Sequence, residues 1–163
     1  MVSEESVEKA CAAVGQFTDE QIAGEFDRFF RAQPALCEFI VEITHESGQH
    51  IQELSLFLSY MIFKTMEAAD AAPATLGPQE IEAAYQKTES WMNRINLIQG
   101  TEMEESVART LQKETEPHLL QYIIAELNEP TEDGSILNDE EKGEVFFVLK
   151  TVITSLCGKE ENL

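Results

Sequence analysis

Residues 33–43 read QPALCEFIVEI and residues 116–126 read EPHLLQYIIAE, and the two stretches share one pattern. Proline, leucine and isoleucine recur at matching places, and Phe39 in the first stretch matches Tyr122 in the second. A proline at the first position of a helix is common, so each stretch taken alone is an ordinary helix start. Shared residues that also occur in the same order indicate an internal duplication.

The similarity continues after an eight-residue insertion in the second copy. The run ELSLFL at residues 53–58 then matches EVFFVL at residues 144–149. We therefore predict a single helical domain over the whole chain. It would comprise two similar four-helix halves, residues 1–72 and 78–160, joined by residues 73–77. The alternative is two unrelated helical hairpins that each begin at a proline.

Start and stop signals for helices recur along the chain, and no segment has the period-2 alternation of a strand. Thr18 and Gln21 form a capping-box pattern, Pro34 and Pro117 stand at helix starts, and Asn138 precedes an acidic first turn. We predict an all-α fold of seven to eight helices. Those with clear boundaries cover about residues 19–31, 35–44, 49–66, 79–98, 102–113, 118–128 and 139–158.

Two of these helices are apolar on nearly every side. Eight of the ten residues from Leu54 to Phe63 are apolar, and residues 145–149 are all apolar. A helix without a polar face is a buried one. We therefore predict that both helices are central, with Phe57 and Phe147 buried in them, and that the acidic helices lie outside.

The composition excludes several classes of protein. With 31 acidic and 11 basic residues, the net charge is −20, which disfavours binding to nucleic acid and to anionic membranes. The longest apolar stretch, residues 54–63, is about half of the roughly 20 residues that a spanning helix needs. Three widely spaced cysteines suggest neither a disulfide framework nor a zinc site, so we expect a cytoplasmic protein. The oligomeric state stays open.

Two patterns resemble parts of metal sites. Glu42 and His45 have the E-x-x-H spacing of di-iron bundles, but the second half of the predicted repeat lacks both residues. Residues 129–140 match part of a calcium-binding loop, with Asp133 and Glu140 as possible ligands. Several ligand positions of that loop hold unsuitable residues, so a turn followed by a capped helix explains the segment better. We predict no cofactor and keep these four residues as weak metal candidates.

Acidic charge is densest at residues 126–144, which hold eight acidic side chains and one lysine. No catalytic motif accompanies it, so we favour a non-enzymatic interaction or regulatory protein. It would present an acidic surface, centred on Glu129, Glu132 and Asp133, to a protein partner with a basic patch. The alternative is a metal- or small-ligand-binding protein that uses the carboxylates near His45 or the loop at residues 129–140.

Overall fold

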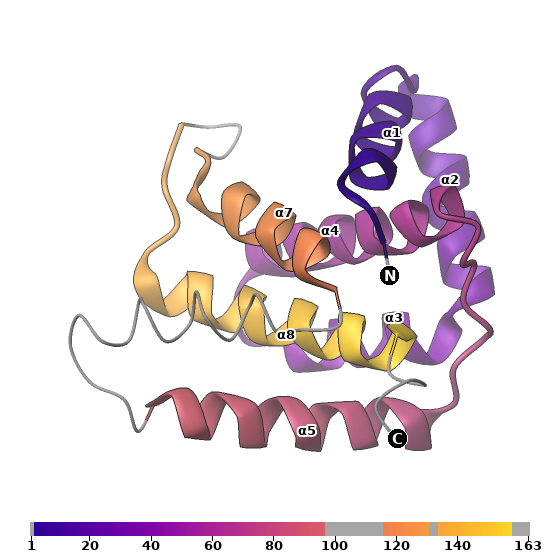
Figure 1. Ribbon diagram of the computed structural model, residues 1–163. Coiled ribbons are helices and arrows are strands. Elements are labelled where there is room, and N and C mark those ends of the chain that lie inside the picture. Colours follow the sequence, from indigo (N-terminus) through magenta and orange to yellow (C-terminus); the bar gives the residue numbers. More distant parts are fainter. Residues whose placement is uncertain (1, 97–115, 131–133, 158–163) are drawn as a thin grey trace.

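The computed structural model describes residues 2–96, 116–130 and 134–157 (Figure 1). Within these ranges the chain forms helices and no strand, which confirms the all-α prediction. The helix predicted at residues 102–113 lies outside the described ranges. The seven described helices are α1 (Glu4–Gly15), α2 (Asp19–Ala32), α3 (Pro34–Ile43), α4 (Gln49–Ala68), α5 (Pro78–Asn96), α7 (Pro117–Asn128) and α8 (Asp139–Cys157).

The predicted helix starts are confirmed by their hydrogen bonds. The Thr18 hydroxyl accepts from the Gln21 backbone N–H at 3.2 Å, and the Gln21 side chain accepts from the Thr18 N–H at 2.8 Å. Asn138 and Glu141 make the same reciprocal pair at the start of α8, at 2.8 and 3.1 Å. Each pair satisfies two backbone groups that would otherwise lack a partner, so the sequence fixes these two boundaries locally.

Helices α4 and α8, which contain the two apolar runs, lie at the centre as predicted. They pack against each other, and α4 also contacts α1, α2 and α3, while α8 also contacts α3, α5 and α7. Figure 1 shows α8 running between α5 and α7. Leu58 and Ile62 on α4 and Leu149 and Val152 on α8 are completely buried. None of the helices in the described ranges is long and apolar enough to cross a bilayer.

The prediction that Phe57 and Phe147 are buried is wrong, because both side chains are only partly covered. Phe147 lies at the edge of the interface with α5, where its ring meets Tyr85 edge-on at 5.3 Å. Phe57 faces α2, with its ring 6.4 Å from that of Phe26. An apolar pattern on all sides of a helix shows that most of it is buried, but neighbouring helices need not cover every position.

The predicted duplication stays a prediction. As expected from it, α3 packs on α4 and α7 packs on α8. Helices from the two predicted halves also pack across the boundary, because α1 contacts α7 and α3 contacts α5. One hydrophobic cluster includes buried residues from both halves, among them Leu36, Leu58, Leu120 and Leu149.

A buried amide at the junction of α2 and α3 holds the connection that follows α4. The Gln33 side chain is completely buried. Its Nε2 donates to the Ala74 carbonyl at 2.9 Å, and its Oε1 accepts from the Leu76 N–H at 3.0 Å. The side chain thus acts as a peptide group would in a sheet, and it satisfies the backbone of a segment that has no regular structure.

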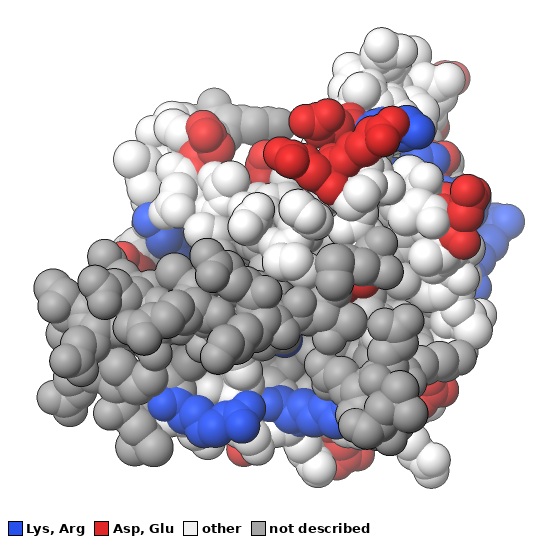
Figure 2. All heavy atoms as spheres, viewed as in Figure 1, with Lys and Arg blue, Asp and Glu red and all other residues white. Residues whose placement is uncertain are grey.

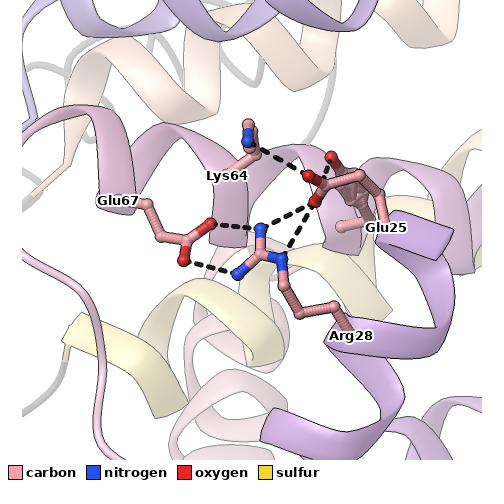
Figure 3. Close-up of polar contacts among 5 residues, drawn as sticks. Glu25, Arg28, Lys64 and Glu67 are labelled. Carbon is pink, nitrogen blue, oxygen red and sulfur yellow. Dashed lines mark hydrogen bonds and ion pairs between the residues drawn. The ribbon is translucent and has the colours of Figure 1, made fainter. Parts of the chain in front are cut away.

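A charged network ties the outer flank of α2 to α4 (Figure 3). The two terminal nitrogens of Arg28 each donate to a different oxygen of Glu67, both at 2.7 Å. Arg28 also donates to Glu25 at 2.7 Å, and Glu25 accepts from the Tyr60 hydroxyl at 3.0 Å and lies 3.5 Å from the Lys64 ammonium. The hydrogen bonds with Glu67 raise the pKa of Arg28 above its ordinary value. The paired bonds fix α2 in orientation as well as in position.

We expect Arg28→Lys to destabilise the fold by about 0.5–1 kcal/mol, because an ammonium cannot reproduce the two parallel bonds to Glu67. The control is Arg31→Lys, since Arg31 is 81% exposed and pairs only with Asp27 one turn away. Urea denaturation of both variants measures the difference. Equal midpoints for the two variants would show that the network does not hold α2.

Truncating the centre of the core should cost far more. We expect Leu149→Ala to lower the free energy of unfolding by about 2–5 kcal/mol, because it leaves a cavity between α8 and its neighbours. Ile136→Ala, at a side chain that is 64% exposed, is the matched control and should change little. Guanidinium denaturation provides the measurement, and a small loss at Leu149 would contradict the central position of α8.

Candidate functional site

An apolar groove of about 740 Å³ opens between α2, α4 and the C-terminal end of α7. Its size falls within the roughly 300–1,000 Å³ that is typical of ligand pockets. Its floor combines side chains of α2 and α4 with residues after α7. The apolar lining residues are Phe26, Phe30, Leu54, Leu56, Phe57, Pro130 and Leu137.

The aromatic floor follows from the apolar stripe of α2. Phe29 is completely buried, and its ring lies 5.2 Å from that of Phe63 on α4. Phe26 and Phe30 stand beside it on the helix surface, one turn apart, and their rings are 6.3 Å from each other. Phe30 is 39% exposed. The stripe is thus wider than the contact with α4 needs, and its outer edge forms the groove.

Carboxylates stand at the rim of the groove. They belong to Glu53 on α4, Glu126 on α7 and Glu129 directly after α7. Glu53 accepts from the Gln49 amide at 2.7 Å, and none of the three forms an ion pair with any residue that the structure describes. The one histidine in the lining, His50, is bonded at 2.8 Å to Glu141. The rim is therefore negative, and no cation in the described part of the chain pairs with its carboxylates.

Keeping the rim carboxylates charged raises the free energy of the folded state. Burial, together with the negative charge of Glu129, raises the pKa of Glu126 above its ordinary value of 4.5. Close like charges beside an apolar surface destabilise the folded state unless something neutralises them. A cation supplied from outside would relieve that penalty, so the rim is suited to a basic ligand.

Two of the three cysteines, Cys11 and Cys37, are poorly suited to act as nucleophiles. Burial raises the pKa of the Cys37 thiol to about 12. Burial also raises the pKa of Cys11, which lies beside Tyr122 and Glu126 between α1 and α7. Both thiols are therefore protonated at neutral pH, and the thiolate is the reactive form.

The weak metal candidates are not assembled into a site. Glu42 lies near the end of α3, His45 lies in the turn that follows, and Glu140 lies in the first turn of α8; all three are exposed. Asp133 falls outside the described ranges. Within those ranges, no group of three or more histidine, cysteine, aspartate or glutamate side chains could hold a metal ion.

Of the predicted partner-binding residues, the structure places Glu129 on the groove. Glu132 and Asp133 lie outside the described part of the chain. Sequence reasoning missed Glu126 and the aromatic floor. The available signal was the stripe of α2, where Phe26, Phe29 and Phe30 together exceed what one helix contact can bury.

Comparison with known proteins adds no family to this geometry. No model of a protein family, no curated protein and no solved structure matches the chain. The functional argument therefore depends on the shape, lining and charge of the groove.

We expect Glu126→Gln to raise the melting temperature at neutral pH, because the folded state disfavours the charged carboxylate. The sign follows from linkage: the folded pKa is raised, so the gain is complete above that value. It shrinks as the pH falls and is absent below the unfolded value near 4.5, where both states bind the proton. Melting curves from about pH 3 to pH 8 test this.

The control for that series is Glu89→Gln, an exposed site on α5 away from the groove. It should leave the melting temperature nearly unchanged at every pH. A Glu126→Gln variant that is less stable than the wild type at neutral pH would contradict the assigned penalty.

Proposed function

We propose that this chain is a non-enzymatic interaction protein of the cytoplasm that presents an acidic surface to a protein partner with a basic patch. The groove carries the proposal, because its apolar floor is open and its rim carboxylates pair with no cation among the residues that the structure describes. A basic partner would supply both the missing cations and the apolar cover. Exposed apolar surface with a charged rim is typical of interaction sites.

The distribution of charge supports steering toward one side of the molecule. The chain has a net charge of −20. Figure 2 shows acidic side chains gathered over α1, while basic side chains line the outer edge of α5. Helix α1 packs on α4 and α7, which form the groove, and α5 packs on α3 and α8. The acidic side chains over α1 therefore add to the attraction of a basic partner.

One observation favours the alternative of a small-ligand protein, namely that the groove has the volume of a ligand pocket. In that case the ligand would be an apolar cation, because the rim is negative. The predicted calcium loop, residues 129–140, contributes four residues to the groove lining, and Glu129 is the one acidic residue among them. The experiment below therefore includes a separate measurement for metal binding.

The test compares two variants with the same change in charge. The groove variant replaces Glu53, Glu126 and Glu129 by Lys. The control variant replaces Glu46, Glu89 and Glu144, which are exposed and lie outside the groove lining. Proteins captured from a cytoplasmic extract by each immobilised chain are quantified across a salt series.

We expect a set of basic proteins that the wild type and the control variant retain and that the groove variant loses. Their capture should weaken as salt screens the attraction. If all three chains capture the same proteins, the proposal is wrong. Melting curves with EDTA and with millimolar Ca²⁺ decide the metal alternative, because a calcium-dependent rise confined to the wild type and control would favour it.

A further inference from the structure

Seven apolar side chains line the groove, and one of them, Phe30, is exposed to solvent. Among the residues that the structure describes, three large apolar side chains are exposed: Phe30, Val41 and Ile136. Phe30 lines the groove, and Ile136 stands between two lining residues, Ser135 and Leu137. Neither Ile136 nor Val41, which is on α3, belongs to the lining itself. Apolar surface that gathers at one concave place marks a binding site more strongly than apolar residues scattered singly.

The negative charge of the rim limits which kinds of ligand could bind in the groove. Three carboxylates border the floor without a cationic partner in residues 2–96, 116–130 and 134–157, and His50 is already bonded to Glu141. An anionic ligand such as a nucleic acid, an anionic lipid or a fatty acid would be repelled. The complementary surface is apolar in the middle and carries Lys or Arg at its edges.

The secondary structure around the groove limits the conformation in which a peptide could bind there. All walls with regular structure are helices, and the described ranges contain no strand edge to which an extended peptide could add. Strand addition therefore has no template here. A common mode that needs no strand edge lays an amphipathic helix into an apolar groove, with anchors at positions i, i+3 or i+4, and i+7.

We propose that the groove binds an amphipathic helix of a partner protein, with large apolar side chains one turn apart and Lys or Arg at the flanks. This inference rests on the proposed function and deepens it. The apolar face of that helix covers Phe30, Leu54 and Phe57. Its basic flanks lie against Glu53 on one side and against Glu126 and Glu129 on the other.

The probe is a synthetic amphipathic peptide of leucine and lysine, roughly 18 residues or five turns long, with an apolar face of helical period. The control peptide has the same composition, but its leucines are spaced so that no helical face forms. Both carry the same fluorescent label. Fluorescence anisotropy with the full chain gives the dissociation constants, and circular dichroism confirms that each variant is folded.

Two serine substitutions, at side chains of nearly equal exposure, distinguish binding in the groove from binding elsewhere on the surface. Phe30→Ser changes the floor at a side chain that is 39% exposed, and Val41→Ser changes α3 at one that is 40% exposed. We expect the amphipathic peptide to bind Phe30→Ser at least about tenfold more weakly than Val41→Ser, a difference of about 1.4 kcal/mol. The control peptide should bind the wild type at least about tenfold more weakly than the amphipathic peptide.

A second variant keeps the test decisive if Phe30→Ser does not fold. The double change Glu126→Gln and Glu129→Gln preserves size and should weaken binding of the amphipathic peptide while raising stability at neutral pH. If both peptides bind the wild type equally and only the rim variant weakens them, the acidic docking surface stands and the helix proposal is wrong. If neither the floor nor the rim variant changes binding, both proposals fail.

The remaining occupant is a second copy of this chain. Sedimentation of the wild type and of Phe30→Ser decides that case. Self-association that Phe30→Ser abolishes and Val41→Ser leaves intact would place another copy in the groove and overturn the proposal. A monomeric wild type that binds the amphipathic peptide supports it.

Discussion

The apolar surface of α4 and α8 is the constraint on which this structure depends. Over residues 54–63 and 145–149 these helices have no polar face to turn toward water, so the two runs must be covered on most sides. The two helices meet each other, and the remaining helices are arranged around them. Positions such as Leu58 and Leu149 lose all contact with solvent as a result. The arrangement of the other helices thus follows from the need to bury the apolar runs of α4 and α8.

One side of α4 is not fully covered by neighbouring helices, and the groove lies there. Helix α2 covers α4 at Phe29 but leaves Phe30, the adjacent residue, open. The end of α7 approaches with carboxylates where an apolar residue would have completed the core. The fold is thereby less stable than it could be at the place that we propose for binding. Such a loss is common when function and stability compete.

Features fixed by local chemistry could be predicted from the sequence, and the groove could not. The caps at Thr18 and Asn138 involve residues three apart, and the central position of α4 and α8 follows from composition. The groove depends on how far α7 stands from α2, and no pattern within either helix encodes that distance. Even Phe29 and Phe30 differ only by the 100° that separates neighbours on a helix, which decides whether a ring is covered.

In the proposed complex, the paired bonds between Arg28 and Glu67 would also limit how wide an occupant of the groove can be. Helix α2 forms one wall of the groove, and this clamp joins it to α4 at residues outside the groove lining. Moving α2 outward would stretch or break the clamp, so a bulky occupant binds with less net free energy than a slender one. In the proposed complex the clamp would therefore limit the size of the occupant, although Arg28 and Glu67 lie outside the groove lining.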